Sequence, residues 1–148
     1  MLIYRIGNIF DFEGQTIVNP VNCVGVMGAG LALQFKMRYP DMFPLYKKYC
    51  DEGLLVPGNL WIWKGVDKWV LNFPTKDHWK NPSNYEFIKS GLDKFRNTYK
   101  DRGIESIAFP LLGAGLGHLV KDDIKLLFKQ YLSQCEIPIV VYETNSEV

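Results

Sequence analysis

A glycine-rich turn that runs into a helix is encoded by residues 22–36, NCVGVMGAGLALQFK. The turn itself covers residues 25–30, and after it Leu31, Ala32 and Phe35 recur at a spacing that places them on one helical face. A turn of this kind exposes backbone N–H groups beside a helix N-terminus, which suits a phosphate oxygen without any basic side chain. The stretch therefore predicts a turn–helix unit with an anion-binding turn.

A second glycine-rich turn, residues 113–117 (GAGLG), has the same context, because an apolar strand precedes it and an amphipathic helix follows. In an open α/β sheet the strand ends converge on one crevice, so two such turns can hold one diphosphate from opposite sides. For either turn alone, a tight turn without a ligand is the commoner explanation. The pair favours a ligand, although neither turn has the Walker lysine or the complete dinucleotide fingerprint.

Strands and helices alternate around these two turns. Strands are predicted at residues 2–6, 16–22, 60–63, 69–73, 106–109 and 137–142. Pro20 is expected to fit poorly in a central strand. Ser83 and Glu86 have the spacing of a capping box, which predicts the start of a helix. The alternation indicates a mixed α/β sheet with helices on both faces.

Length and composition narrow the class of protein. The 148 residues fit one domain, 47% of them are hydrophobic, and the formal net charge is +1. That charge gives no long-range attraction to nucleic acid or to an anionic membrane. The chain has no apolar run near the ~20 residues that a membrane span needs, and no secretory leader. Its three scattered cysteines predict neither a disulfide framework nor a zinc cluster, so a reducing cytoplasm is the expected compartment.

Residues 61–80 hold all four tryptophans of the chain, together with four lysines and two aspartates. Aromatic side chains among lysines can form a platform on which unpaired bases stack. Trp61, Trp63 and Trp69 are more simply explained as core residues of the sheet. Trp79 differs from them, because it follows a polar segment that lies beyond the strand.

Lys76 is the candidate for chemistry in that segment, because Pro74 ends the strand just before it and stiffens the turn. A lysine beside a sugar can stabilise a departing group, or, with a lowered pKa, attack the anomeric carbon. Most lysines in proteins have neither role, and the sequence does not choose between the two for Lys76. Cys23 is better explained as a small buried residue than as a nucleophile. His78 and His118 have no visible Ser/Cys–carboxylate partner.

These residues resemble the macrodomain family of ADP-ribose-binding modules. The resemblance rests on residues 22–36 and on PLLGAGLG at residues 110–117, and it spans essentially the whole chain. Residues 72–79, NFPTKDHW, resemble the DarG-like branch, whose members are antitoxins that remove ADP-ribose from thymidine in single-stranded DNA. The resemblance implies one macrodomain over residues 1–148, an α/β fold built as a three-layer α/β/α sandwich with a mixed six-stranded sheet.

The resemblance also implies a ligand cleft along the strand ends and a role for each matching residue. Lys76 would be the catalytic residue at the anomeric carbon. Asn8 and Ile9 would lie at the adenine end, with Tyr142 near the adenine face, and Asn22 would meet the distal ribose. The residues implied to bind ADP-ribose are Asn8, Ile9, Asn22, Gly25, Val26, Met27, Gly28, Ala29, Gly30, Leu31, Thr75, Gly113, Ala114, Gly115, Leu116, Gly117 and Tyr142.

The implied activity is hydrolysis of the N-glycosidic bond between ADP-ribose and thymidine in single-stranded DNA, with no metal and no cofactor. His78, Trp79 and Lys80 would hold the unpaired nucleotide. A DarT-like toxin would be a partner, and no membrane is involved. Three alternatives stay open: a non-catalytic ADP-ribose reader, an ADP-ribose 1″-phosphate phosphatase, and a hydrolase of ADP-ribosylated protein.

Two positions depart from the family pattern. Many macrodomains carry an aspartate where this chain has Asn8, so a weaker contact with the adenine amine is expected. Eukaryotic relatives pair their lysine with an aspartate in the second loop, where this chain has Gly117, so a lysine–aspartate mechanism does not carry over. DarG proteins usually continue into a toxin-binding domain, which predicts that this chain is an excised domain or a stand-alone relative.

Overall fold

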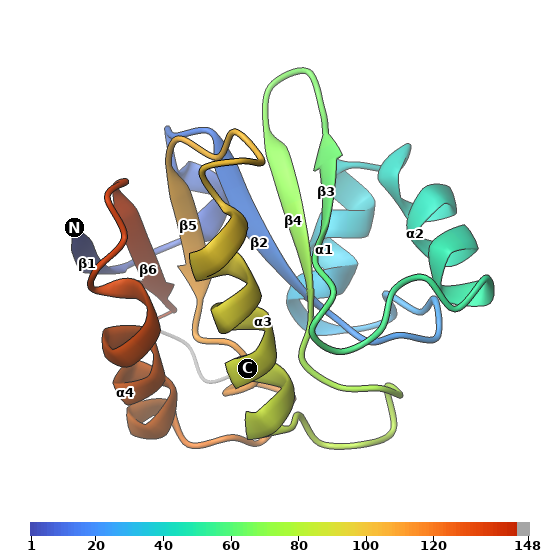
Figure 1. Cartoon of the computed structure of the whole chain (residues 1–148). Helices are drawn as coiled ribbons and strands as arrows, with labels where there is room; N and C mark the ends of the chain where they lie inside the picture. The colour runs from blue at the N-terminus through green and yellow to red at the C-terminus, as the bar shows by residue number, and fades with distance from the viewer. Residues whose placement is uncertain (145–148) are drawn as a thin grey trace.

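A six-stranded sheet forms the middle layer of the computed structural model, which describes residues 1–144 (Figure 1). The strand order is β1-β6-β5-β2-β4-β3, and all neighbours are parallel except β3 and β4. The strands are β1 (Leu2–Ile6), β2 (Thr16–Val21), β3 (Trp61–Lys64), β4 (Trp69–Pro74), β5 (Ile107–Pro110) and β6 (Ile139–Glu143). The mixed sheet predicted from the sequence is therefore confirmed.

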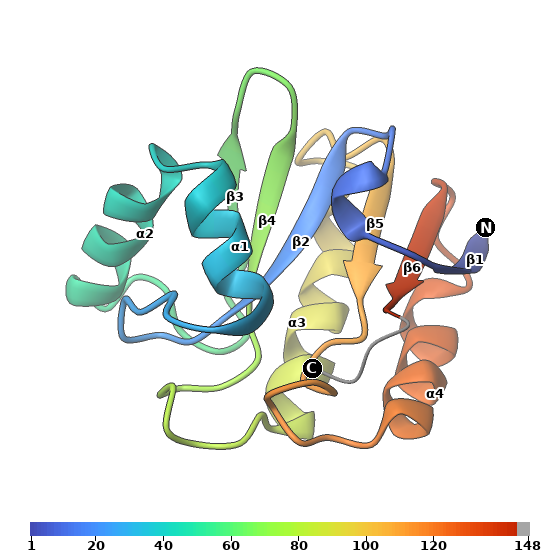
Figure 2. The same ribbon diagram turned by 180° about the vertical axis from the view of Figure 1, so that it is seen from behind.

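Helices cover both faces of the sheet, which confirms the three-layer sandwich (Figures 1 and 2). One face carries α1 (Gly30–Arg38) and α2 (Met42–Asp51), and the other carries α3 (Tyr85–Thr98) and α4 (Lys121–Leu132). A short 3-10 helix, η1 (Ile9–Asp11), follows β1. Within residues 1–144, no helix is long and apolar enough to cross a membrane.

The sequence analysis did not predict α2, which contains Pro44. This proline is the third residue of the helix, where its missing N–H has no intrahelical acceptor to bind. Proline is therefore tolerated there. Its presence is the reason why the sequence around residues 42–51 was not predicted to be helical.

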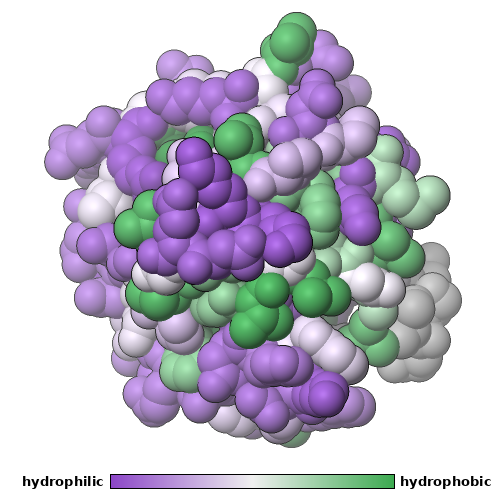
Figure 3. All heavy atoms as spheres, turned by 90° about the vertical axis from the view of Figure 1, so that its right-hand side faces the viewer, coloured by the Kyte–Doolittle hydropathy of each residue, from purple (hydrophilic) through white to green (hydrophobic). Residues whose placement is uncertain are grey.

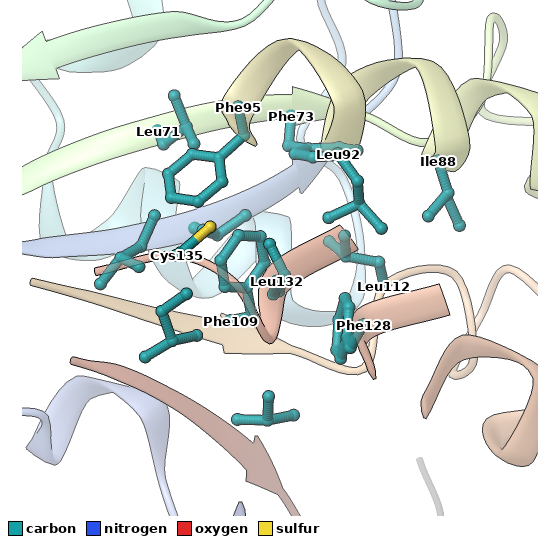
Figure 4. Packing of buried hydrophobic residues seen from close by; sticks show 14 of the residues in the cluster. Leu71, Phe73, Ile88, Leu92, Phe95, Phe109, Leu112, Phe128, Leu132 and Cys135 are labelled. Atoms are coloured by element: carbon teal, nitrogen blue, oxygen red, sulfur yellow. The ribbon is translucent and has the colours of Figure 1, made fainter. Parts of the chain in front are cut away.

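The layers are held together by two clusters of buried apolar residues, one on each face of the sheet. Beneath α3 and α4, aromatic and leucine side chains from both helices meet those of β4 and β5 (Figure 4). On the opposite face, α1 and α2 contribute Phe35, Met42 and Tyr46, none of which is exposed. Trp61 and Trp63 pack against this second cluster while they stay partly exposed. β2 is covered on both faces, and five of its six residues are buried, including the polar Thr16 and Asn19.

Pro20 lies in β2, near the middle of the sheet, contrary to the expectation from the sequence. β2 pairs with β4 along its whole length but with β5 only through Thr16 and Ile17. The N–H of Thr16 donates to Ser106 O on the β5 side, so by alternation the nitrogen of Pro20 points to that side too. There it lies beyond the end of the pairing with β5, so no ladder hydrogen bond is lost.

The capping box predicted at Ser83 is wrong. α3 is capped by Asn84, whose side-chain oxygen accepts the N–H of Glu86 at 2.8 Å. Asparagine is as good an N-cap as serine, so the shift by one residue has no cost to the helix. Ser83 is instead buried, and its hydroxyl donates to the hydroxyl of Thr75 at 3.3 Å.

Gly91 tests the packing of α3 on β4. A Cβ at this position would lie 2.3 Å from Cζ of Phe73, which is fully buried. We expect Gly91→Ala to lower the free energy of unfolding by about 1–3 kcal/mol through overpacking, although alanine favours a helix. Asn97→Ala, on the exposed side of the same helix, is the matched control and should change the free energy of unfolding by less than about 0.5 kcal/mol. Urea denaturation measures both, and equal stabilities would contradict this packing.

Candidate functional site

Three loops meet at the carboxyl ends of three neighbouring parallel strands, at the lower edge of the sheet in Figure 1. We call them the first glycine loop (residues 22–29, after β2), the lysine loop (residues 75–84, after β4) and the second glycine loop (residues 111–120, after β5). Parallel strands bring their carboxyl ends to the same edge, where ligands of open α/β sheets bind. This edge is therefore the candidate site.

Backbone hydrogen bonds join the lysine loop to the first glycine loop. The N–H of Thr75 donates to Val21 O at 3.0 Å, and the N–H of Cys23 donates to Asp77 O at 3.0 Å. The thiol of Cys23 lies 3.7 Å from Lys76 O. Burial raises the pKa of this thiol to about 12, which favours the protonated thiol over the nucleophilic thiolate at neutral pH.

The lysine loop is joined to the second glycine loop in the same way. The N–H of Ser83 donates to Gly117 O at 3.0 Å, and within the lysine loop the N–H of Asn84 donates to Thr75 O at 2.9 Å. Gly30, which follows the first glycine loop and begins α1, meets the second glycine loop, because a Cβ at Gly30 would lie 2.8 Å from Cδ1 of Leu116. The two turns that the sequence placed in one crevice are thus in contact.

Backbone amides of both glycine loops are available to a ligand. Within residues 1–144, the N–H groups of residues 28–30 and 115–117 make no hydrogen bond to the protein. The first group leads directly into α1, whose N-cap residue provides no side-chain hydrogen bond. Free amides at a helix N-terminus, with a second set on a neighbouring loop, can donate to the oxygens of an anion.

Asn22 shapes the first glycine loop from inside. Its Oδ1 accepts the N–H groups of Val24 and Val26, at 3.1 and 3.4 Å, and its Nδ2 donates to Val26 O at 2.7 Å. The hydroxyl of Tyr46 lies 2.9 Å from that Oδ1 and 2.8 Å from Asn22 O. The residue predicted to meet the distal ribose therefore also holds the fold of its own loop.

Tyr46 is a site residue that the sequence analysis missed. It lies on α2, it is fully buried, and 24 positions separate it from Asn22. No local motif signals this contact, because only the packing of α2 on the sheet brings the hydroxyl to the loop.

Lys76 is half-buried, and its ammonium group stands apart from other charges. Within residues 1–144 it makes no hydrogen bond and no ion pair. Burial lowers its pKa below the ordinary lysine value, because desolvation disfavours the charged form and no carboxylate offsets it. All of its donor capacity is available to a substrate.

The lysine loop continues into an exposed turn that carries Trp79. Asp77 accepts hydrogen bonds from the side chain of Asn81 and from the N–H of His78, and these lower the pKa of its carboxyl. The indole of Trp79 is 51% exposed, with the His78 ring 5.4 Å away and the Lys80 ammonium 5.3 Å from its centroid. The three residues predicted to contact nucleic acid are thus adjacent and accessible.

The surface beside these loops is partly apolar. Val24, Val26 and Leu116 are each exposed by a third or more, although they come from two different loops. On the side of the molecule that carries α2, apolar patches lie between hydrophilic areas (Figure 3). A ligand at this edge therefore meets apolar contacts as well as free amides.

A separate cavity of about 520 Å³ lies beside η1 and includes Asn8 and Tyr142 among its lining residues. Asn8 also caps η1, since its side chain accepts the N–H of Phe10 at 2.9 Å. Ile9 is buried in the second apolar cluster. The residues predicted at the adenine end therefore lie together, whereas the glycine loops do not line this cavity. Within residues 1–144, no group of three or more His, Cys, Asp or Glu is placed to hold a metal ion.

Comparison with known proteins identifies the family. The family model described as Macro domain matches residues 18–126. The curated "DNA ADP-ribosyl glycohydrolase" of Mycobacterium tuberculosis is 38% identical over 150 residues, which cover 96% of this chain and 42% of that protein. The chain thus spans about two fifths of the length of the curated relatives that it matches.

Solved structures agree with this assignment. The macrodomain of Mycobacterium tuberculosis DarG superposes with a TM-score of 0.91, at 38% identity, over 96% of this chain and 97% of that one. Thermosipho africanus DarTG, solved in complex with ADP-ribose, gives a TM-score of 0.89 at 37% identity, over 96% of this chain and 41% of that one. A curated protein of Thermosipho africanus, 36% identical over 92% of this chain and 40% of its own length, is named a DNA ADP-ribosyl transferase-DNA ADP-ribosyl glycohydrolase fusion protein.

Tyr46 provides a test of how the first glycine loop is held. Tyr46→Phe removes the hydroxyl that contacts Asn22, and we expect it to lower the free energy of unfolding by about 1–3 kcal/mol. Tyr49→Phe, on the same helix, is the control, because the Tyr49 hydroxyl makes no hydrogen bond within residues 1–144. Urea denaturation compares the two variants, and equal losses would contradict the role given to Tyr46.

Proposed function

The chain belongs to the macrodomain family, and we propose that it hydrolyses the N-glycosidic bond between ADP-ribose and thymidine in single-stranded DNA. One observation carries the proposal: the half-buried ammonium of Lys76, without a partner in residues 1–144, lies in a loop bonded to both glycine loops. The names of the high-coverage relatives support the reaction.

ADP-ribose is the proposed ligand of the loops. The free amides of residues 28–30 and 115–117 would donate to the diphosphate, which explains how a protein of net charge +1 binds an anion. Asn8 and Tyr142 would lie at the adenine end, and Asn22 at the distal ribose. The relative from Thermosipho africanus, solved with ADP-ribose, supports this choice of ligand.

The proposed reaction breaks one bond and forms one. Water attacks the anomeric carbon of the distal ribose while the C–N bond to the base breaks. The electron pair of that bond leaves with the base nitrogen, which takes a proton from the Lys76 ammonium. The amine then recovers a proton from the attacking water, so ADP-ribose and unmodified thymidine are released. Binding of the remote diphosphate holds the ribose in the reactive geometry.

Single-stranded DNA is the proposed carrier of the modified base. An exposed indole stacks on a base without regard to its identity, and stacking is worth ~1–3 kcal/mol per base. Trp79 provides that surface in the same loop as Lys76, and Lys80 supplies a positive charge near the indole. We further propose a DarT-like transferase as the partner that makes the modification, as the name of the fused relative suggests.

Lys76→Ala tests the chemistry. We expect at least about a 100-fold loss of kcat on an ADP-ribosylated thymidine oligonucleotide, because the proton donor is removed. Binding of ADP-ribose by calorimetry should change by less than about threefold, since the proposed ligand contacts are main-chain amides. Lys129→Ala, an exposed lysine of α4, is the matched control and should be fully active.

The pH dependence of the same rate distinguishes the acid from the nucleophile. The ammonium is the active form in this proposal, so the rate should be constant at neutral pH and fall as the pH rises through the pKa of Lys76. Because burial lowers that pKa, the fall should begin at a lower pH than for an exposed lysine. A covalent adduct trapped by borohydride would contradict the acid role. Release of inorganic phosphate, or turnover of modified protein only, would favour the alternative activities.

Trp79→Ala tests the DNA contact. We expect KM for a modified oligonucleotide to rise roughly 5- to 150-fold, the range that corresponds to the loss of one stacked base at ~1–3 kcal/mol. KM for ADP-ribosylated thymidine nucleoside, which has no neighbouring bases, should be unchanged. An equal rise of KM for both substrates would refute a role for Trp79 in binding the strand.

A further inference from the structure

Ser83 is a buried polar residue whose position in the site no local rule explains. It is 6% exposed, it does not cap α3, and it lies near the end of the lysine loop, against the second glycine loop. Its N–H binds Gly117 O at 3.0 Å and its hydroxyl donates to Thr75 Oγ1 at 3.3 Å. This residue thus contacts the start of its own loop and the second glycine loop with separate groups.

The second glycine loop is shaped around the Ser83 side chain. A Cβ at Gly117 would lie 2.2 Å from Ser83 Oγ, and a Cβ at Gly113 would lie 2.8 Å from Ser83 Cβ. Gly113 also has a positive φ of 74°. The serine hydroxyl therefore occupies the space that any side chain at Gly117 would need, and the loop closes tightly on it.

Thr75, the residue before Lys76, is held from both sides. Its N–H binds Val21 O at the end of β2, and its carbonyl accepts the N–H of Asn84. It is 3% exposed, and its hydroxyl receives the hydrogen bond from Ser83. The position of the Lys76 backbone relative to the second glycine loop therefore depends on this one side-chain link in addition to main-chain bonds.

We propose that Ser83 is a positioning residue that sets the distance between Lys76 and the second glycine loop, acting through Thr75 and Gly117. This inference rests on the proposed function, in which Lys76 is the proton donor and the second glycine loop holds the diphosphate. Proton transfer needs donor and acceptor within hydrogen-bond reach, and a shift of 1 Å can cost 10²-fold in rate. Ligand binding by main-chain amides is less sensitive, because each loop keeps its own amides.

The test is Ser83→Ala, which keeps the main-chain bond to Gly117 and removes the hydroxyl. We expect kcat on the modified oligonucleotide to fall roughly 10-fold, while KM and the Kd for ADP-ribose stay within about threefold. Thr75→Val breaks the same hydrogen bond from the other side and should lower kcat similarly. The double variant should be no more than about twofold slower than Ser83→Ala, because both changes remove one interaction. Thr75→Val alone provides the test if Ser83→Ala does not fold.

Ser106→Ala is the matched control. Ser106 Oγ accepts the N–H of Gln15 at 2.8 Å at the opposite ends of the strands, so its loss should lower thermal stability without changing kcat. The inference is overturned if Ser83→Ala keeps the wild-type kcat, if KM rises as much as kcat falls, if the double variant loses rate multiplicatively, or if Ser106→Ala slows equally. Failure of the wild type to cleave any ADP-ribosylated substrate would instead refute the proposed function.

Discussion

The candidate site depends on the parallel alignment of β5, β2 and β4. Because these strands run in the same direction, three loops far apart in sequence leave the sheet at one edge. A line of hydrogen bonds then crosses the site from Val21 to Thr75, from Thr75 to Ser83 and from Ser83 to Gly117. Each loop has hydrogen bonds of its own, and these bonds between neighbours fix how the loops lie relative to one another.

The chemistry of the site follows from what these loops leave unpaired. Backbone amides carry only partial charges, yet several of them on facing loops can neutralise a diphosphate without lysine or arginine side chains. Lys76 can therefore stay free of structural ion pairs within residues 1–144, as a donor for the reaction. The net charge of +1 fits a site in which free amides, and not basic side chains, would hold the diphosphate.

Several local expectations were changed by packing. Pro20 fits in a central strand because its nitrogen points past the end of the pairing with β5. Ser83 has the sequence spacing of a helix cap, yet Asn84 takes that role, and the serine is buried against Thr75 and the second glycine loop. α2 was hidden by Pro44, and with it the contact of Tyr46 to Asn22.

The amino-acid sequence alone determined the six strands, the helices other than α2, the two glycine turns and the prominence of Lys76, because these depend on local periodicity, turn residues and short motifs. It also indicated the family, through motifs at three places along the chain. Only the tertiary structure decided which side chains hold the loops together. Tyr46 contacts Asn22 across 24 positions of sequence, and Ser83 contacts Gly117 across 34. Contacts between residues so far apart in the chain arise from packing and not from a local sequence pattern.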